Sequence, residues 1–580
     1  MPELRQTHSH WTEVPTDESA AARLSAALEL PLLVGRLLTQ RKVLSVEEAQ
    51  QFFHPRWQDL LDPFEMRDMH KAVSRLERAV ESKERILLYG DYDVDGTTSV
   101  AMMYAFLSEF YKNLDIYLPD RDREGYGIST EGVEYARDQQ CALIIAMDCG
   151  IKANEAVALG NGYGIDFIIC DHHLPEGLLP DAVAVLDPRR VDCSYPFKDL
   201  SGCGIAFKLI QALAMHYNMP CEELESLSDF LAVSIACDIV EMTGENRILT
   251  CYGLKRLTRQ PRTGLKALLS YTNHKANLDV NDLVFGLGPI INAAGRLGDA
   301  RDAVYTMLAN DSEIAGRAAG ELARRNERRR AVDQDITGAA LKMVREAPEW
   351  QQRKSIVLFN PEWHKGIIGI TASRLSEYFY RPTVIFMESA GIGIGSARSV
   401  PGFNLYEALS RCDDLFYRFG GHAHAAGIQM PVDNIPAFAE RFEALAQTYP
   451  GFYNIPLYDI AATVRFEELT PALLQLLEKL EPYGPGNRHP VFRALNVVDA
   501  GGTRRLNNNH IRLTLRHTDS TQVFKGVGFG LADFFENIQI KRPFDIIFTA
   551  KEEEWRGVRS IVIYVKDAKQ PSSLQKLPDL

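Results

Sequence analysis

The sequence lacks the cysteine patterns of a structural zinc site or a disulfide framework, because its nine cysteines include no C-x-x-C pair. It also has no run of about 18 apolar residues, the length that a membrane-spanning helix needs. The first residues, with Glu3, Arg5 and Glu13 among them, have no apolar core of the kind found in signal peptides. We therefore expect a cytoplasmic protein that does not enter a membrane.

The chain has fewer basic than acidic residues. The sequence has 64 lysines and arginines against 77 aspartates and glutamates, which gives a net charge of −13. This charge argues against a surface coated in basic residues, but it does not exclude a local basic path for nucleic acid, since metal-binding carboxylates add to the acidic count. Basic residues do gather at Arg121 and Arg123, at Arg296 and Arg301, and in a run of arginines between residues 324 and 330.

The chain, with 580 residues, is too long for a single hydrophobic core. Short apolar runs alternate with helix-like stretches from Ile86 to about Val240, which is typical of a parallel sheet with crossover helices. The alternation resumes after Pro348, and a long charged stretch without proline, Glu313–Val344, separates the two regions. We interpret that stretch as a solvated spanning helix rather than a DNA-binding helix.

The last part of the chain consists of short β-like runs without a long helix. Five such runs lie between Ala494 and Val565, a strand count that is typical of an OB-fold barrel. Cations alternate there with aromatic residues, as in proteins that bind single strands. The candidates for DNA contact are Arg504, Arg512, Lys525 and Phe529. A plain barrel with a charged exterior explains these residues equally well.

Three apolar runs in the first half of the chain are followed directly by acidic residues or histidines. They are Ile86–Tyr89 with Asp91, Asp93 and Asp95, Ala142–Met147 with Asp148, and Phe167–Cys170 with Asp171, His172 and His173. The carboxyl ends of parallel strands meet at one edge of a sheet, where α/β folds place ligands and catalytic groups. Carboxylates and imidazoles are therefore expected to converge at that edge.

Several ionised carboxylates in one place repel one another, so their convergence requires either strongly raised pKa values or a bound cation. Oxygen-rich ligation with one or two imidazoles favours Mg²⁺ or Mn²⁺ over zinc. The alternative is that Asp91 and Asp93 are turn residues and that His172 caps a helix or packs in the core. That alternative explains each residue singly, but not the same chemistry at three strand ends.

Two glycine-rich segments after Pro348 suggest a place where the backbone approaches a ligand closely. They are GSARS at residues 395–399 and GGHAHAAG at residues 420–427. A glycine-rich loop with an arginine suits a phosphate group. The candidates for a phosphate or DNA pocket are Gly395, Ser396 and Arg398 first, then Arg296, together with Arg121, Arg123 and His422. His422 is also explained as an ordinary polar loop residue.

Taken together, these motifs resemble the RecJ family of bacterial single-strand-specific 5′-to-3′ exonucleases, in the DHH phosphoesterase superfamily. The resemblance runs from about residue 60 to 570. The motifs are, in order, YGDYDVDG at 89–96, Asp148, DHH at 171–173, Asp238 in ACDIV, WHKGIIG at 363–369, GSARS, GGHAHAAG, and EPYGPGN at 481–487. Each motif alone is weak, but their order and completeness make the combination highly specific.

The resemblance implies a mixed α/β fold with a DHH-type parallel-sheet catalytic domain, a long linking helix, a second α/β (DHH-associated) domain and a β-barrel OB-fold domain. We place an N-terminal helical segment at residues 1–60, the catalytic domain at 61–305, the linking helix at 306–348, the DHH-associated domain at 349–455, the OB-fold DNA-binding domain at 456–570 and a tail at 571–580.

The resemblance also implies two divalent ions, Mg²⁺ or Mn²⁺, held by strand-end residues. The residues matched to the ligands of one ion are Asp93 and Asp148, and those matched to the other are Asp95, Asp148, His172 and Asp238. Asp148 would bridge the two ions. Asp91, Asp171 and His173 are expected around these ligands or on the substrate phosphate, and His173 is counted with the ligands as catalytic.

One position departs from the superfamily pattern. Relatives often place a histidine four residues before the aspartate matched by Asp93, where this chain has Tyr89. A phenol is a poor ligand for Mg²⁺, so this position leaves the occupancy of the first metal site open.

The function implied by the resemblance is a metal-dependent exonuclease that degrades single-stranded DNA from the 5′ end, releases nucleoside monophosphates and acts in DNA recombination and repair. A single-strand-binding protein and a DNA helicase are implied as partners, and we expect a monomer. A small-molecule phosphoesterase would use the same metal site, but the cationic barrel argues against it. A non-catalytic replication factor would share the architecture but should have lost carboxylates, and here the acidic set is complete.

Overall fold

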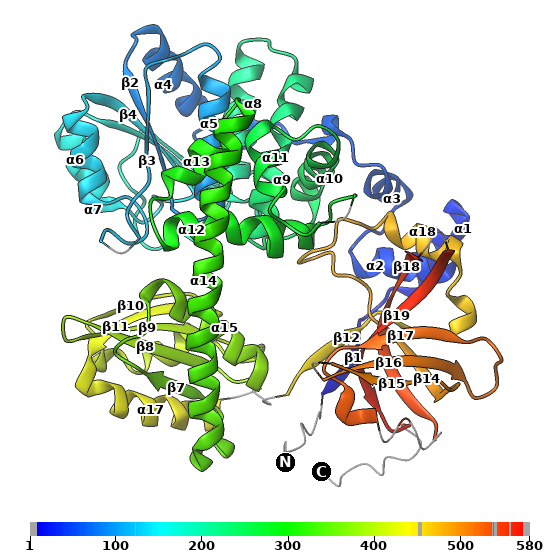
Figure 1. Ribbon diagram of the computed structural model, residues 1–580. Helices are drawn as coiled ribbons and strands as arrows, with labels where there is room; N and C mark the ends of the chain where they lie inside the picture. The colour runs from blue at the N-terminus through cyan, green and yellow to red at the C-terminus, as the bar shows by residue number, and fades with distance from the viewer. Residues whose placement is uncertain are drawn as a thin grey trace. The chain divides into compact units, whose positions relative to one another are not determined.

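The structure is a computed structural model that describes residues 9–121, 123–274, 276–449, 455–507, 509–535, 538, 542–555 and 558–571. The chain forms two compact units (Figure 1). One unit is Pro55–Tyr453, and the other combines Met1–His54 with Asn454–Leu580. The expected tail at 571–580 lies outside the described residues, apart from Pro571.

The first half of the Pro55–Tyr453 unit is built on a five-stranded parallel sheet in the order β3-β2-β4-β5-β6. Its strands are β2 (Arg85–Gly90), β3 (Leu114–Tyr117), β4 (Cys141–Met147), β5 (Asp166–Cys170) and β6 (Ala184–Leu186). The central strands β2, β4 and β5 are buried almost throughout, as expected for a parallel sheet covered on both faces. The expected parallel sheet is confirmed.

Helices cover both faces of this sheet. The helices packed on its strands are α4 (Met69–Glu81), α5 (Val94–Leu107), α6 (Thr130–Asp138), α7 (Asn154–Gly162) and α8 (Gly202–His216). The region continues with α9 (Ser228–Cys237), α10 (Gly244–Arg259), α11 (Thr263–Leu269), α12 (Gly288–Arg296) and α13 (Arg301–Leu308), which pack on other helices. Helices α6 and α7 share a core with Leu87 and Tyr89 of β2. Ile86 and Leu88, which alternate with them, belong to the larger core on the other face.

The strand order reverses beside β2, because the chain passes from β2 to β3 on one side and to β4 on the other. In open α/β sheets, ligands bind outside the carboxyl ends of the strands at such a reversal. Gly90 ends β2 and Met147 ends β4. The acidic residues that follow these two strands are therefore placed at the reversal.

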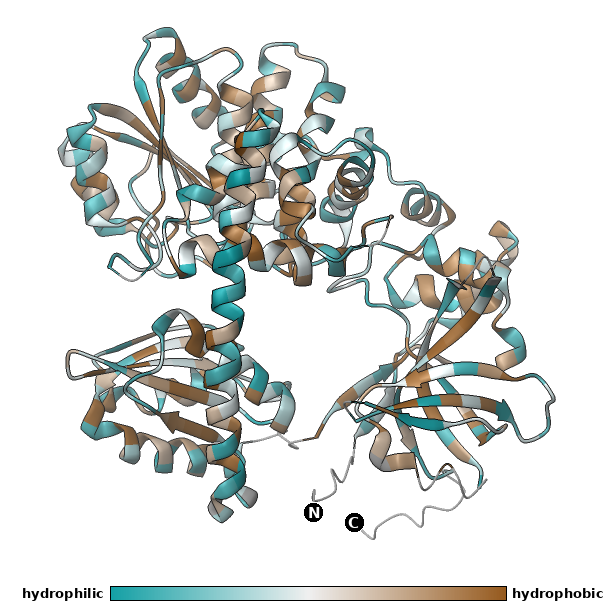
Figure 2. Cartoon of the chain, viewed as in Figure 1, coloured by the Kyte–Doolittle hydropathy of each residue, from teal (hydrophilic) through white to brown (hydrophobic). Residues whose placement is uncertain are grey.

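The expected long linking helix is α14 (Ser312–Glu346), which is 35 residues long. Ala319 and Leu322 near its start belong to the core of the parallel-sheet region, whereas Ile336 and Ala340 belong to a core with α15 (Lys365–Phe379). Its middle section is strongly hydrophilic (Figure 2). Within the described part of the chain, no helix is both long enough and apolar enough to cross a membrane.

A second α/β region follows α14, as expected. Its mixed five-stranded sheet has the order β10-β11-β9-β8-β7, in which only β7 and β8 run parallel. Its elements are β7 (Ile356–Phe359), α15, β8 (Thr383–Ser389), β9 (Ile392–Arg398), α16 (Leu405–Ser410), β10 (Arg418–Gly421), β11 (Ala425–Pro431) and α17 (Ile435–Thr448). Strand β9 contains the glycine-rich GSAR sequence.

The C-terminal β-runs form a closed barrel. Its strands are β14 (Phe492–Asp499), β16 (His510–His517), β17 (Phe524–Gly528), β18 (Phe544–Trp555) and β19 (Val558–Lys569). They close in the order β14-β16-β17-β19-β18-β14, and only β17 and β19 pair in parallel. The five expected strands and the OB-fold barrel are confirmed.

The N-terminal helices pack on this barrel. They are α1 (Glu18–Leu28), α2 (Leu32–Gln40) and α3 (Val46–Phe53), and their Leu37 and Leu38 share one core with Phe492 and Phe548. Strand β1 (His10–Glu13) pairs with β12 (Leu457–Ile460). The sequence suggests only that the first 60 residues are helical, and no local pattern in them indicates this long-range packing.

Candidate metal centre and phosphate site

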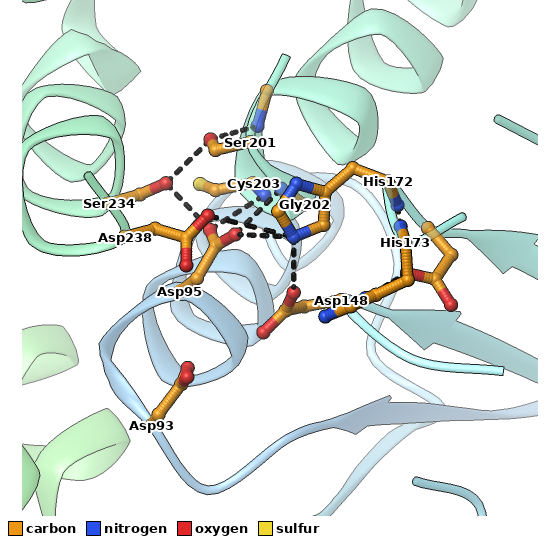
Figure 3. Close-up of polar contacts among 12 residues, drawn as sticks. Asp93, Asp95, Asp148, His172, His173, Ser201, Gly202, Cys203, Ser234 and Asp238 are labelled. Atoms are coloured by element: carbon orange, nitrogen blue, oxygen red, sulfur yellow. Dashed lines mark hydrogen bonds and ion pairs between the residues drawn. The ribbon is translucent and has the colours of Figure 1, made fainter. Parts of the chain in front are cut away.

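Acidic residues that follow β2 and β4, together with Asp238 at the C-terminal end of α9, lie around His172, which follows β5 (Figure 3). His172 Nε2 lies 3.2 Å from Asp148 Oδ1, 3.6 Å from Asp238 Oδ2 and 3.9 Å from Asp95 Oδ2. Among the described residues, three groups have ligand atoms within 4.8 Å of one another: Asp91, Asp93 and Asp148; Asp95, His172 and Asp238; and Asp148, His172 and His173. Asp148 belongs to two of these groups and is placed to bridge them.

Asp95 is fixed by the N-terminus of α8. Its Oδ2 accepts a hydrogen bond from the Gly202 amide at 2.7 Å, and its Oδ1 accepts one from the Cys203 amide at 2.9 Å. The Ser234 hydroxyl donates to Oδ1 at 2.6 Å. Backbone amides at a helix N-terminus favour an anionic group, so both oxygens of Asp95 are held in place by the start of α8.

Asp148 is held in an uncommon backbone conformation directly against α8. Its φ is 60°, in the left-handed region that aspartate tolerates better than most residues. A Cβ on Gly202 would lie 2.6 Å from Asp148 Cβ and 2.8 Å from its Oδ1. Glycine at 202 therefore allows the two carboxylates, Asp95 and Asp148, to approach the same helix end.

Burial and mutual repulsion dominate the electrostatics of this edge. Burial, followed by the charges of neighbouring aspartates, raises the pKa of Asp91, Asp93, Asp148 and Asp238. A divalent cation would remove this repulsion and keep all four carboxylates ionised at neutral pH.

Unpartnered polar atoms point to the same cation. Burial lowers the pKa of His172, so its imidazole is neutral, the form that ligates metals. Neither ring nitrogen of His172, nor Oδ1 of Asp91, has a hydrogen-bond partner among the described residues, although all three atoms are buried. Buried polar atoms are normally satisfied. The donor set of carboxylates and one or two imidazoles therefore fits Mg²⁺ or Mn²⁺.

Asp171 orients the two histidines rather than joining the ligands. It accepts hydrogen bonds from the amides of Ile151 and His172, both at 2.8 Å, and from His173 Nδ1 at 2.7 Å. Burial opposes its ionisation, but the bond and the charge of His173 outweigh burial and bring the pKa of Asp171 to about 2. Burial also opposes the charge on His173, yet Asp171 raises the pKa of His173 overall.

Two of the expected residues have a structural use as well. Asp93 caps α5, because its Oδ1 accepts a hydrogen bond from the Gly96 amide at 3.1 Å. The turn and cap alternative is therefore correct for one oxygen of Asp93. Tyr89 is fully buried, and its hydroxyl donates to the Gly127 carbonyl at 3.0 Å.

A cluster of arginines lies beside the acidic edge. Burial, followed by repulsion from Arg121, Arg329 and Arg398, lowers the pKa of Arg296 to about 9. Burial and the charge of Arg121 lower the pKa of Arg398 as well. No carboxylate forms an ion pair with Arg121, Arg296 or Arg398 within the described ranges. The cluster therefore has the charge and the crowding of an anion site.

Polar groups of the second α/β region form hydrogen bonds with the arginines of this cluster. Arg296 Nη1 donates to the Gly366 carbonyl in the first turn of α15 at 2.7 Å. Arg398 Nη1 donates to Ser396 Oγ at 3.2 Å, and a Cβ on Gly369 would lie 2.9 Å from that oxygen. Ser396, Arg398 and the start of α15 are therefore adjacent.

Three further candidates have different surroundings. A Cβ on Gly395 would lie 2.4 Å from the Phe386 ring, so this glycine is required for sheet packing. Burial, and then the charges of His424, Arg398 and His173, lower the pKa of His422, which places it near both clusters. The exposed Arg123 pairs with Asp120 at 3.6 Å, and no described contact joins it to the arginine cluster.

The acidic and basic clusters meet at Tyr92. The Arg121 guanidinium lies over the Tyr92 ring, 4.9 Å from its centroid. Burial and the charge of Asp93 raise the pKa of Asp91, while the charge of Arg121 opposes this rise. A candidate cation site and a candidate anion site thus lie side by side within one unit.

Several residues at these sites were not found from the sequence. Gly202 and Ser234 act through contacts with Asp95 and Asp148, and the Ser-Gly-Cys-Gly sequence at 201–204 shows only a helix start. The Tyr126 hydroxyl donates to the Asp148 carbonyl at 3.0 Å. Arg329 lies in the charged run of α14, where nothing in the spacing separates it from its exposed neighbours.

The barrel has a candidate surface of its own. Phe529 is 58% exposed, and its ring stacks on Tyr564 with 6.3 Å between centroids and 14° between planes. Arg504 lies opposite Arg512 on strands β15 (Arg504–Leu506) and β16, and both side chains are exposed, as is Lys525 on β17. OB-folds bind oligonucleotides on the face of their second and third strands, which correspond to β16 and β17.

Comparison with known proteins decides the family. Family models match residues 85–235 (DHH family, N-terminal domain), 352–448 (DHHA1 domain) and 460–567 (RecJ OB domain). The single-stranded-DNA-specific exonuclease RecJ of Bacillus subtilis is 34% identical over 564 residues, which cover 96% of this chain and 70% of that protein. The chain belongs to the RecJ family.

Solved RecJ structures agree with the fold. The crystal structure of RecJ from Thermus thermophilus in complex with Mn²⁺ has a TM-score of 0.84 and 27% identity, and the match covers 99% of this chain and 81% of that one. The Mg²⁺ complex of the same protein has a TM-score of 0.77 and 26% identity, with coverage of 97% and 78%. The resemblance drawn from the sequence motifs is confirmed.

The packing of Gly202 yields a prediction on metal affinity. Gly202→Ala should weaken Mn²⁺ binding about tenfold or more, because the new methyl group displaces Asp148 and the amide that holds Asp95. Calorimetric titration with Mn²⁺ measures this. The matched control is Gly204→Ala, whose Cβ would approach Leu200 no closer than 3.2 Å. A folded Gly202→Ala protein that binds Mn²⁺ like the control would contradict the proposed ligand set.

Proposed function

We propose that this chain is a metal-dependent exonuclease that degrades single-stranded DNA from its 5′ end and releases nucleoside monophosphates. The observation that carries the proposal is the pairing of two clusters, a carboxylate and imidazole set beside an arginine set without carboxylate partners among the described residues. A phosphodiester substrate with a terminal phosphate suits both clusters. Its scissile bond would lie at the metal ions, and its terminal phosphate would lie at the arginines.

The acidic cluster is the hydrolytic centre in this proposal. Two divalent ions about 4 Å apart would supply an activated water and stabilise the charge of the phosphoryl transition state. The ligands would be Asp93 and Asp148 with Asp91 beside them for one ion, and Asp95, Asp148, His172 and Asp238 for the other. Asp171 raises the pKa of His173, which favours the cationic form, and the ring would donate a hydrogen bond to a phosphate oxygen.

The arginine cluster sets the polarity of cleavage. Arg121, Arg296 and Arg398 would bind the 5′-terminal phosphate, whose two negative charges relieve the repulsion among the guanidinium groups. Because this site adjoins the acidic cluster through Tyr92, a bond near the 5′ end would lie at the metal ions. A strand without a free end could not place a phosphate there.

The wider setting of the reaction follows from family membership. RecJ relatives are named single-stranded-DNA-specific exonucleases, and we extend the proposal to a role in DNA recombination and repair in the cytoplasm. A single-strand-binding protein and a DNA helicase as partners, and a monomeric enzyme, belong to the same proposal.

The proposal is tested by digestion of end-labelled DNA. The protein with Mg²⁺ or Mn²⁺ should release labelled mononucleotide first from 5′-labelled single strands, and duplexes with blunt ends should be degraded much more slowly. Asp148→Ala should abolish cleavage while leaving DNA binding largely intact, since Asp148 is the shared ligand of two groups. Release of the 3′ label first, or near-normal turnover by a folded Asp148→Ala protein, would overturn the proposal.

The arginine cluster yields a prediction on end recognition. Arg398→Ala should reduce the preference for a 5′-phosphorylated strand over a 5′-hydroxyl strand by about 1.5 to 3 kcal/mol, because a charge-assisted contact is lost. Competition binding with the two strands measures this preference. Arg411→Ala is the control, since the exposed Arg411 in the same region pairs with Glu407 at 2.9 Å. Equal losses on both strands would remove Arg398 from the pocket.

The barrel surface yields a prediction on long substrates. Phe529→Ala should weaken binding of long single strands by about 1 to 3 kcal/mol through loss of base stacking, while cleavage of the shortest strands stays unchanged. Lys525→Ala should show a loss that shrinks as salt rises, since its contribution is counterion release.

Point variants are preferred here to truncation, because removal of the barrel would expose the core that it shares with α1–α3. The control is Leu457→Ala, which removes an exposed apolar side chain from β12 of the same unit. Processive degradation of long strands by Phe529→Ala at the normal rate would make the barrel a structural or partner-binding module.

A further inference from the structure

Tyr89 occupies the position where DHH relatives often place a histidine, but its side chain packs in the core beside α6 and α7 and bonds to backbone groups. It is 0% exposed, on the face of β2 that packs against α6 and α7. Its ring stacks on Tyr117 with 5.3 Å between centroids and 23° between planes. Its hydroxyl donates to the Gly127 carbonyl at 3.0 Å and accepts a hydrogen bond from the Ser129 amide at 3.1 Å. The Tyr89 hydroxyl therefore donates one hydrogen bond and accepts another, both with backbone groups.

Those backbone groups belong to the segment that joins β3 to α6, residues 118–129, of which Asp122 lies outside the described residues. A second set of bonds closes the same segment on itself. Glu124 Oε2 accepts hydrogen bonds from the Tyr117 hydroxyl at 2.8 Å and from Ser129 Oγ at 2.5 Å, and Glu124 Oε1 accepts one from the Asp120 amide at 2.7 Å. Tyr89 and Glu124 thus fix the two ends of one loop.

The loop carries two side chains to the candidate site. Arg121 lies over Tyr92 and acts electrostatically on Asp91, Arg296 and Arg398. The Tyr126 hydroxyl contacts the His173 ring at 3.0 Å as well as the Asp148 carbonyl. The Tyr126 residue as a whole is 54% exposed, and its ring meets the His173 ring edge to face, with 5.4 Å between centroids. Because Tyr126 directly precedes Gly127, the backbone that the Tyr89 hydroxyl holds also places the Tyr126 ring.

We infer that Tyr89 is a positioning residue that acts through this loop: its hydroxyl holds Gly127 and Ser129, and thereby sets Arg121 on the 5′-phosphate and Tyr126 beside the metal ligands. This inference rests on the proposed function and assigns to the chain a second use of a position that supplies a metal ligand elsewhere in the superfamily. A histidine side chain is too short to reach from β2 to the Gly127 carbonyl in the same way.

The test separates loop positioning from metal binding and from general stability. Tyr89→Phe keeps the stacked ring and removes only the hydroxyl. We expect it to weaken binding of a 5′-phosphorylated single strand, measured in EDTA, about fivefold to tenfold, as for loss of one or two hydrogen bonds. Binding of the 5′-hydroxyl strand and Mn²⁺ affinity by calorimetry should stay within about twofold. In turnover, KM for the phosphorylated strand should rise more than kcat falls.

A double variant shows whether Tyr89 acts through Arg121. The effect of Tyr89→Phe on phosphate preference should largely disappear in an Arg121→Ala background, because residues that act through one contact are not additive. The control is Tyr135→Phe, which removes a hydroxyl that donates to Asp115 at 3.0 Å on the same side of the sheet but outside the loop. Tyr135→Phe should leave the phosphate preference unchanged.

The outcomes distinguish this inference from the proposed function. If the wild-type protein degrades 5′-phosphorylated strands but Tyr89→Phe binds both strands and Mn²⁺ as the wild type does, the inference is wrong and the nuclease proposal stands. A Tyr89→Phe protein with changed Mn²⁺ affinity and unchanged phosphate preference would instead make Tyr89 part of the metal site. Absence of nuclease activity in the wild type would overturn the proposed function itself, whereas the metal-free binding comparison would still report on the loop.

Discussion

Repulsion among carboxylates buried at one sheet edge is the constraint around which the Pro55–Tyr453 unit is organised. Burial and neighbouring charge raise the pKa of Asp148 and Asp238, and the protein opposes this rise with one arginine charge, that of Arg189 on Asp238. Arg296 and Arg398 belong to a separate group of arginines. Burial and mutual repulsion lower the pKa of both guanidinium groups. In the proposed function each cluster is completed by a partner from outside the chain, a cation for one and an anion for the other, and a metal-bound phosphodiester would supply both.

The parts of the fold that follow from the sequence are those with a local pattern. The apolar runs of β2, β4 and β5 are continuous because both faces are covered, so the runs and the aspartates after them predict the sheet and its functional edge. Strand β3 is half-exposed and β6 has only three residues, and neither has a pattern that separates it from a loop. The domain boundaries drawn from the sequence stay predictions.

The candidate site divides in the same way. Aspartates and histidines after strands carry their chemistry in their side chains, so the order of residues along the chain is enough to single them out. Gly202 acts through a backbone amide and the absence of a methyl group, and Tyr89 acts through a loop about forty positions away in the chain, as its bond to Ser129 shows. Such roles depend on which segments lie next to one another in the folded protein, and this cannot be predicted from local patterns in a single sequence.

The core shared by α1–α3 and the barrel has a consequence for the order of events during synthesis. The helices leave the ribosome before the barrel does, yet Leu37 and Leu38 are buried in one core with Phe492 and Phe548, which are synthesised more than 450 residues later. The closure entropy of so long an insertion grows only slowly with its length, and the inserted unit can fold in the meantime. A nascent chain therefore acquires its acidic and arginine clusters while the apolar faces of its first helices are still uncovered. The barrel closes only when β19 has emerged, so chains that stop early would present the acidic and arginine clusters without a closed barrel.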